Sequence, residues 1–198
     1  MLSAKLGHSL DPLIIKVYKI VFFKREINPN VLTLLGFLFG IGCFVSVVFG
    51  YLALGGIFLI ISGFFDLVDG SLARGTKRVT VFGGFLDSVL DRYTDLLVLS
   101  GIGIHFLLNR DIHSVVITII SSVGVAIIPY VKARAQAEGL NCDTGILERP
   151  ERTILLIVGL IFSIVEYCMI ILAFLSHITV FQRVLFVKRH SEALKTSE

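Results

Sequence analysis

Apolar segments long enough to cross a bilayer recur along nearly the whole chain, and they constrain its fold more than any other feature. A helix needs about 20 residues to cross a hydrocarbon core of about 30 Å. Of the 198 residues, 55% are hydrophobic, and the mean hydropathy is +0.89. This mean hydropathy lies far above that of soluble domains. The sequence therefore predicts an all-α integral membrane protein.

We expect six transmembrane helices that form one bundle. The segment 153–187 is nearly continuous, but a single helix of that extent would be about 50 Å long, too long for one crossing. We therefore divide it at "SIVEY", which contains Glu166. The expected spans are residues 30–50, 53–74, 83–108, 112–135, 152–165 and 167–187.

The two ends of the chain differ from this apolar middle. In residues 1–27, Leu10, Leu13, Ile14 and Val17 recur at helical spacing with lysines between them. This pattern is typical of an amphipathic juxtamembrane helix that lies on the membrane surface. We expect it to precede a six-helix transmembrane domain at residues 28–190, followed by a polar C-terminal tail at 191–198.

Basic residues are distributed unequally between the two sides of this layout. Basic residues in short loops favour the cytoplasmic side, and Arg110 is the only one in the loops on the other side. We therefore expect a multi-pass protein of the cell membrane with both termini in the cytoplasm. This placement, together with anionic lipid headgroups, explains the net charge of +3 without a nucleic-acid partner. The four basic groups lie within residues 5–25, 74–78, 132–152 and 183–195.

Two pairs of aspartates flank the connection between the second and third spans. Asp66 and Asp69 are three residues apart, and Asp87 and Asp91 are four apart, so each pair shares one helical face. Four carboxylates in a low-dielectric bundle would repel one another unless cations balanced them. Two divalent ions, magnesium or manganese, could bridge them and also hold a pyrophosphate. No His or Cys accompanies the cluster, which argues against zinc.

A simpler interpretation is that the aspartates are the solvated ends of two helices. They would then pair with nearby basic residues such as Arg74 and Arg92. The small residues favour a ligand site instead, because Gly70, Ala73 and Gly83 leave space for a ligand to lie against the backbone.

The complete string, D-x2-D-G-x2-A-R-x8-G-x3-D-x3-D, resembles the signature of the CDP-alcohol phosphotransferase family. The six-helix layout and the amphipathic N-terminal segment are also similar to that family, so the resemblance covers nearly the whole chain. The matching positions are Asp66, Asp69, Gly70, Ala73, Arg74, Gly83, Asp87 and Asp91.

The resemblance implies that a hydroxyl attacks the β-phosphorus of a CDP-linked lipid, either CDP-diacylglycerol or CDP-archaeol, and that CMP leaves. It implies that the four aspartates hold two magnesium ions and that Asp91 also takes the proton of the hydroxyl. It implies a homodimer with the active site on the cytoplasmic side. The implied CDP-lipid residues are Asp66, Asp69, Gly70, Ala73, Arg74, Thr80 and Gly83, with Pro29, Asn30, Val31 and Leu32 at the start of the first span.

The physical chemistry agrees with these roles. Arg74 would offset charge on the pyrophosphate, and the N-terminus of a helix offers free N–H groups to phosphate. The stretch "NPN" can equally be read as a plain helix start, capped by Asn28 or Asn30.

The acceptor alcohol is read from a second stretch, the basic loop at residues 130–152. Guanidinium groups bind phosphate oxygens in bidentate fashion, so this loop would suit a phosphate-bearing acceptor. The alternative is that these cations only mark the cytoplasmic side. The predicted acceptor residues are Lys132, Arg134, Arg149 and Arg152.

The pattern "KARA…G…ERPER" is similar to the family branch that makes inositol-phosphate lipids. The stretch "LDSVLDR" departs from the "LDPxADK" form that is usual in phosphatidylglycerophosphate synthases. We therefore expect inositol phosphate as the acceptor, ahead of glycerol 3-phosphate or another phosphorylated alcohol.

A cation transporter or channel is an alternative of another class, since intramembrane carboxylates often line ion paths. Such a path should continue across the bundle, whereas the acidic motif lies toward the cytoplasmic half. No Ser/His/Asp or Cys/His nucleophile is evident, which favours direct displacement. Asp95 follows Asp91 by one turn, and we expect it to make a structural ion pair, with Arg92 as the candidate partner.

Overall fold

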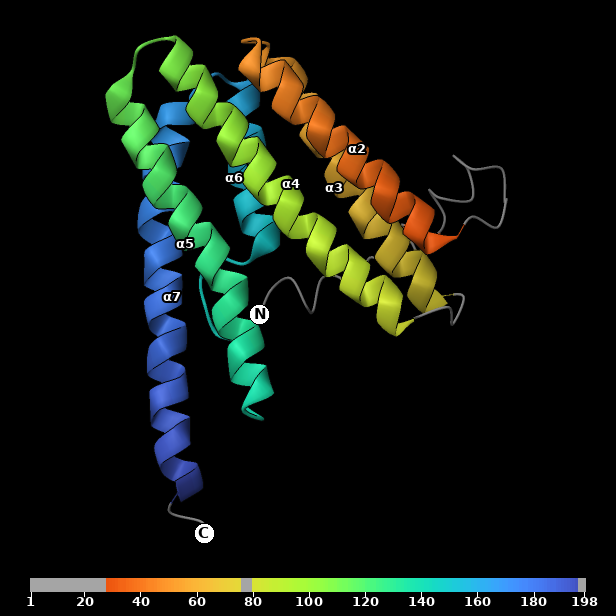
Figure 1. The fold of residues 1–198 in the computed structure, drawn as a ribbon, viewed down its shortest axis with the longest axis vertical. Helices are drawn as coiled ribbons and strands as arrows, with labels where there is room; N and C mark the ends of the chain where they lie inside the picture. Colours follow the sequence, from red (N-terminus) through yellow and green to blue (C-terminus); the bar gives the residue numbers. More distant parts are fainter. Residues whose placement is uncertain (1–27, 76–79, 196–198) are drawn as a thin grey trace.

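The computed structural model describes residues 28–75 and 80–195, and its regular elements there are all α-helices, which confirms the expected all-α architecture. The amphipathic segment expected at 1–27 lies outside the described residues. The helices, labelled as in Figure 1, are α2 (Pro29–Val48), α3 (Leu52–Gly75), α4 (Val81–Leu108), α5 (Ile112–Ala137), α6 (Arg149–Ile161) and α7 (Val165–Lys195).

The helices form two groups joined through α4 and α6 (Figure 1). In the first group α2 packs against both α3 and α4, and in the second α5 packs against α7. A tight turn connects α4 to α5, and the short helix α6 contacts both α3 and α7. Residues from both groups therefore meet at the junction that α6 bridges.

Side-chain caps begin the helices near the predicted site. Asn28 caps α2, because its Oδ1 accepts a hydrogen bond from the Asn30 N–H at 3.0 Å. Thr80 caps α4 in the same way, with its Oγ1 accepting from the Gly83 N–H at 3.0 Å. Such caps satisfy backbone donors that have no partner within the helix. Capping by Asn28 leaves the Asn30 side chain free for another role.

Two glycines of α2 allow its neighbours to approach closely. An added Cβ at Gly36 would lie 3.3 Å from the Ser62 carbonyl oxygen of α3. A Cβ at Gly40 would lie 2.8 Å from Thr94 Cγ2 of α4. Small residues at helix contacts are typical of membrane bundles. This close packing fixes α3 and α4, which carry the aspartates, relative to one another.

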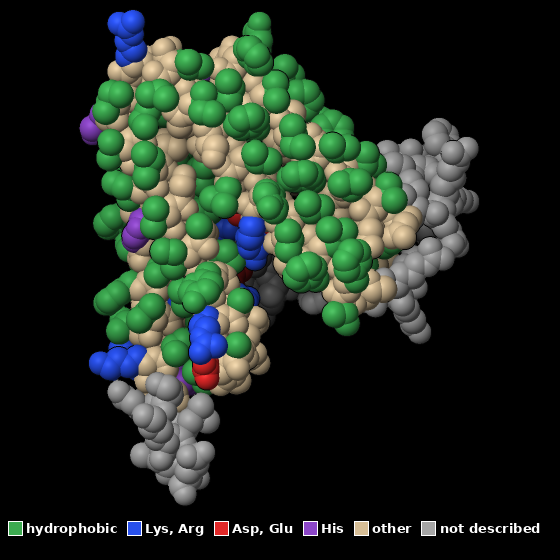
Figure 2. All heavy atoms as spheres, in the orientation of Figure 1, with side chains coloured by type: hydrophobic (Ala, Val, Ile, Leu, Met, Phe, Trp, Pro, Cys, Tyr) green, Lys and Arg blue, Asp and Glu red, His purple; other side chains and the backbone are tan. Residues whose placement is uncertain are grey.

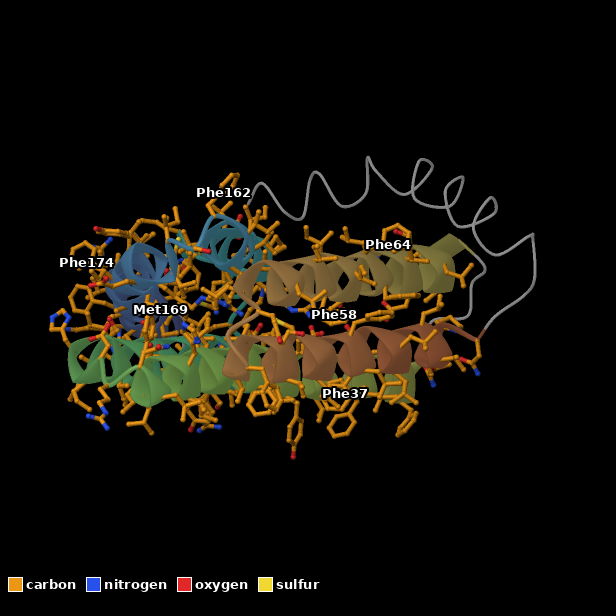
Figure 3. The ribbon with its side chains drawn as sticks, turned by 90° about the horizontal axis from the view of Figure 1, so that it is seen from above. Phe37, Phe58, Phe64, Phe162, Met169 and Phe174 are labelled. Carbon is orange, nitrogen blue, oxygen red and sulfur yellow. The ribbon has the colours of Figure 1, made fainter. Side chains whose placement is uncertain are left out.

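The interior of the bundle is apolar, and much of the exterior is apolar too. Figure 3 shows Phe58 and Met169 pointing between helices, while Phe64, Phe162 and Phe174 point outward. In Figure 2 hydrophobic side chains are spread over the visible face of both groups of helices. An apolar exterior of this extent is expected of a surface that meets lipid rather than water.

Four of the described helices are long and apolar enough to cross a membrane, namely Pro29–Val48, Leu52–Gly75, Ile112–Ala137 and Val165–His190. The other two expected spans do not meet this criterion. Helix α4 is long enough but carries Asp87, Asp91, Arg92 and Asp95 among its first 15 residues. Helix α6 has 13 residues, which corresponds to about 20 Å.

The last two helices divide a few residues earlier than expected. Helix α6 ends at Ile161, and α7 begins at Val165. The break falls on residues 162–164, where Ser163 has a φ of +55°. Glu166 therefore lies in the first turn of α7 instead of in the turn between helices. Helix α7 also continues to Lys195, into the segment expected to be a polar tail.

Candidate active site

Asp66, Asp69 and Asp87 form a compact group of carboxylates contributed by α3 and α4. One carboxylate oxygen from each lies within 4.8 Å of the others. Asp66 and Asp69 are one turn apart near the end of α3, and Asp87 lies in the second turn of α4. Asp69 is 5% exposed, and the other two are half-buried. The spacing read from the sequence therefore corresponds to a real cluster.

Two oxygens of this group lack a hydrogen-bond partner among the described residues. They are Asp69 Oδ2 and Asp87 Oδ1, and both are shielded from solvent. A buried carboxylate oxygen without a partner is unfavourable unless a cation or donor reaches it. Magnesium and manganese are hard cations that take carboxylate oxygens as ligands. The three carboxylates thus fit a divalent metal ion.

Asp91 lies outside this group of three and is held by arginines. Its Oδ1 is 2.7 Å from Arg149 Nη2, and its Oδ2 is 3.6 Å from Arg92 Nη1. The other terminal nitrogen of Arg149, Nη1, is 2.6 Å from Asp66 Oδ2. One guanidinium from α6 therefore joins carboxylates on α3 and α4. That Asp91 also binds metal stays a prediction.

A small pocket of about 160 Å³ lies beside the aspartates, between the starts of α2 and α4 and the end of α3. It brings together most of the predicted CDP-lipid residues. Three do not line it. Val31 is exposed, and Leu32 is fully buried against Val68 and Leu72, because successive residues of a helix point in different directions. Asp66 pairs with Arg149 instead. The lining residues are Pro29, Asn30, Thr33, Asp69, Gly70, Ala73, Arg74, Thr80, Gly83, Gly84 and Asp87.

Steric crowding explains why glycine occupies positions 70 and 83 in this pocket. An added Cβ at Gly83 would lie 2.9 Å from Thr80 Oγ1 and 3.0 Å from Asn30 Oδ1. At Gly70 it would lie 3.2 Å from Arg74 Nη1. A side chain at Gly83 would therefore displace Thr80, and one at Gly70 would crowd the guanidinium of Arg74.

A larger pocket of about 640 Å³, here called the basic pocket, lies between α4, α5, α6 and α7. In Figure 2 basic and acidic side chains meet in a hollow between the two groups of helices. The pocket is polar as well as basic, with Ser88, Gln136 and Glu148 in its wall. The cationic residues that line it are Arg92, Lys132, Arg149, Arg152 and Arg183.

The four predicted acceptor residues have different positions. Lys132, Arg149 and Arg152 line the basic pocket, whereas Arg134 is directed elsewhere and pairs with Glu138, the residue that caps the C-terminus of α5. Lys132 Nζ is 2.7 Å from Asp143 Oδ1, and this hydrogen bond lowers the pKa of the Asp143 carboxyl.

Arg152 makes the ion pair that the sequence assigned to Arg92. Its Nη2 lies 2.9 Å from Asp95 Oδ2, so the partner of Asp95 is on α6 rather than beside Asp91 on α4. The docking of α6 alongside α4 brings together residues 57 positions apart. Arg152 is 3% exposed, and its Nε has no hydrogen-bond partner among the described residues. The Nε–H of Arg152 is therefore available to donate a hydrogen bond to a ligand.

Sequence reasoning missed Arg183 as a site residue. It is 2% exposed and donates from Nη1 to the Ile128 carbonyl at 2.7 Å and from Nε to the Thr144 carbonyl at 2.9 Å. The available signal was an arginine within an otherwise apolar helix, which usually has a function. In the sequence, Arg183 is instead counted with the basic residues of 183–195 that indicate the cytoplasmic side.

Comparison with known proteins decides the family. The family model of CDP-alcohol phosphatidyltransferases matches residues 26–185. The chain belongs to this family. An archaetidylinositol phosphate synthase of Pyrococcus horikoshii is 36% identical over 167 residues, which cover 84% of this chain and 86% of that protein. A phosphatidylinositol phosphate synthase of Mycobacteroides abscessus is 37% identical over 153 residues, covering 73% and 70%.

Solved structures agree with this CDP-alcohol phosphatidyltransferase assignment. The crystal structure of Mycobacterium tuberculosis phosphatidylinositol phosphate synthase with CDP-DAG bound matches with a TM-score of 0.77 at 32% identity, over 89% of this chain and 92% of that one. The same enzyme in complex with manganese and citrate matches with a TM-score of 0.78 at 32% identity, over 89% and 87%.

Family membership confirms the interpretation of the aspartate string. The alternative of an ion path leaves this family match unexplained. The protein is a membrane-embedded CDP-alcohol phosphatidyltransferase, and its metal-binding candidates are the aspartates of α3 and α4.

Proposed function

We propose that this enzyme transfers the phosphatidyl or archaetidyl group of a CDP-linked lipid to a hydroxyl of inositol phosphate and releases CMP. The arrangement of the two pockets carries this proposal. The small pocket and the basic pocket both adjoin the aspartates, the first through Asp69 and Asp87 and the second through Arg149. A donor and a phosphate-bearing acceptor bound in these pockets would meet at the carboxylates.

The CDP group would occupy the small pocket. Its pyrophosphate would lie near Arg74 and the N-terminus of α2, where a positive side chain and the helix dipole favour anions. Gly70, Ala73 and Gly83 would let the nucleotide approach the backbone, and Thr80 and Asn30 would offer hydrogen bonds. Val31 and Leu32 would act only by shaping α2.

Two divalent ions, magnesium or manganese, would be held by Asp66, Asp69, Asp87 and Asp91. When bound, they would supply Lewis-acid stabilisation of charge on the pyrophosphate and on the departing CMP. The relative with manganese bound supports this chemistry. The unpartnered oxygens of Asp69 and Asp87 support it independently.

The transfer itself would be a direct displacement. The acceptor oxygen forms a bond to the β-phosphorus, and the bond from that phosphorus to the bridging oxygen breaks, so that CMP leaves with that oxygen. Asp91 would take the hydroxyl proton. Its side chain is mostly buried and forms an ion pair with Arg149, a residue that also lines the basic pocket, so it lies toward the acceptor side of the cluster.

The phosphate of the acceptor would be bound by Lys132, Arg149, Arg152 and Arg183. Guanidinium groups suit phosphate because their planar donors match two oxygens at once. The names of the relatives support inositol phosphate over glycerol 3-phosphate. We leave Arg134 out of this set because its guanidinium pairs with Glu138.

In the membrane, all six helices of residues 28–190 would cross, with α4 and α6 contributing the polar site. Both termini and the site would face the cytoplasm, because the basic clusters lie on that side. The enzyme would act as a homodimer, as the family resemblance implies.

The test is an acceptor panel. Purified protein is incubated with CDP-diacylglycerol or CDP-archaeol and one alcohol at a time, and CMP is measured by chromatography. We expect CMP with inositol phosphate and magnesium, and none after chelation by EDTA. Equal release with glycerol 3-phosphate, serine or water would contradict the assigned acceptor.

A further inference from the structure

Arg149 connects the aspartate cluster to the basic pocket. Its Nη1 and Nη2 lie 2.6 Å and 2.7 Å from carboxylate oxygens of Asp66 and Asp91, and its side chain lines the basic pocket as well. The two carboxylates are on different helices. A single arginine at the start of α6 thus contacts the groups assigned to the metal and the space assigned to the acceptor.

A guanidinium and a divalent cation on the same carboxylates would repel each other. Like charges a few ångströms apart in a partly desolvated site interact strongly, so each weakens the binding of the other. Asp91 is affected most, because both of its oxygens already lie near arginine nitrogens, at 2.7 Å and 3.6 Å. Asp69 and the unpartnered Oδ1 of Asp87 have no such contact with Arg149.

Arg149 also differs from its neighbour Arg152 in its freedom to change partners. The side chain of Arg152 is 4% exposed and is paired with Asp95, whereas that of Arg149 is 25% exposed. An acceptor phosphate in the basic pocket would offer Arg149 two oxygens in place of the two carboxylates. Its backbone need not move, because the side chain already borders both places.

We propose that Arg149 is an internal counterion for Asp66 and Asp91, and that its transfer to the acceptor phosphate frees these carboxylates for a divalent cation. This inference rests on the proposed function. Because coupling between two sites is reciprocal, phosphate tightens metal binding and metal tightens phosphate binding. The chain would thereby favour the complete metal site only when an acceptor is present.

The test measures metal binding rather than turnover. Full-length protein in nanodiscs is titrated with Mn²⁺, and free Mn²⁺ is followed by electron paramagnetic resonance, with and without inorganic phosphate. A protein-free titration corrects for complexes of Mn²⁺ with phosphate. In the unmodified protein we expect phosphate to tighten the weaker Mn²⁺ binding about tenfold.

Arg149→Gln should bind Mn²⁺ about tenfold more tightly without phosphate and gain nothing further from it. Arg92→Gln is the matched control, because it removes the same charge 3.6 Å from Asp91 without bridging two carboxylates. Its effect should be clearly smaller, and it should retain the response to phosphate. Equal effects of the two substitutions would mean general electrostatics and would overturn the inference.

The unmodified protein alone can decide the inference and separate it from the proposed function. If Arg149→Gln does not fold, the unmodified protein still decides, since Mn²⁺ binding that ignores phosphate overturns the counterion role. If Mn²⁺ and phosphate are uncoupled but CMP is still released with inositol phosphate, only the inference fails. If the unmodified protein binds no Mn²⁺ under any condition, the proposed function fails with it.

Discussion

Asp91 is the residue at which the proposed chemistry is concentrated. It lies outside the compact group of three carboxylates and forms an ion pair with Arg149. We predict that Asp91→Asn reduces CMP release by at least about a hundredfold, the lower range for loss of a general base. The amide keeps the size of the side chain but cannot take a proton, so the protein should still fold. CMP release and size-exclusion behaviour are the measurements.

Glu166→Gln is the matched control for this change. Glu166 is exposed in the first turn of α7, away from both pockets, so loss of its charge should leave CMP release unchanged. Near-normal turnover by Asp91→Asn would remove Asp91 from the role of proton acceptor.

Arg152 gives a second prediction at the scale of single residues. Arg152→Ala should raise the KM for inositol phosphate more than the KM for the CDP-lipid, because Arg152 lines only the basic pocket. Asp95→Asn should raise the same KM by a smaller factor, since it loosens the Arg152 side chain without removing it. Steady-state kinetics with each substrate varied in turn measure both. Equal increases in the two KM values would contradict this assignment.

The residues of the site were predictable to different extents. Asp66, Asp69 and Asp87 could be grouped from sequence because helical spacing alone brings two of them onto one face. The contacts of Arg149 and Arg152 could not, because they depend on how α6 docks against α3 and α4. Arg183 was missed because its charge resembled a topology signal, while its burial is a property of the folded bundle.

At the scale of elements, four helices end in the same way. The residue after the cap has a positive φ at Gly50, Arg110, Gly139 and Ser163. In each case the next N–H donates to a carbonyl five residues earlier, as from Ile164 to Gly159 at 2.9 Å. This is the Schellman pattern, which favours glycine at the left-handed position. The turns at Arg110 and Ser163 therefore place a residue with a side chain where glycine is more favourable.

We predict that Ser163→Gly stabilises the protein by about 1 kcal/mol, the cost of a left-handed conformation for a residue with a side chain. Gly139→Ala makes the reverse change at an equivalent turn. An added Cβ there meets no atom within 4 Å, so only the strain of the φ of +77° affects stability. It should destabilise by a similar amount. Thermal unfolding in detergent measures both. A change of the same sign in the two variants would contradict this account of the turns.

The helix bounds were largely predictable, since the apolar segments give them to within a few residues. The division between α6 and α7 was displaced because no Gly or Pro marks it. The turn uses Ser163, which carries no strong turn signal in sequence. Helix α6 was expected to end at residue 165, and it ends at Ile161.

At the scale of the whole molecule, the central prediction concerns orientation. A cysteine in place of Arg189, exposed near the end of α7, should react with a membrane-impermeant maleimide only from the cytoplasmic side. A cysteine in place of Arg110, in the turn between α4 and α5, should react only from the other side. Labelling of intact cells and of inverted vesicles distinguishes the two.

The unmodified chain is the control for this labelling. Its cysteines, Cys43, Cys142 and Cys168, are all buried, so it should not react from either side. In the expected six-helix layout α5, α6 and α7 cross three times between the two positions, which places Arg110 and Arg189 on opposite sides. Reaction of both introduced cysteines from the same side would require an even number of crossings and would contradict this layout.

The most direct measurement is the identity of the lipid product. Purified enzyme, magnesium and CDP-diacylglycerol are incubated with an equimolar mixture of inositol phosphate and glycerol 3-phosphate, and the lipids are analysed by mass spectrometry. The account predicts that phosphatidylinositol phosphate predominates and that CMP forms in equal amount. A predominance of phosphatidylglycerol phosphate, or no new lipid at all, would contradict it.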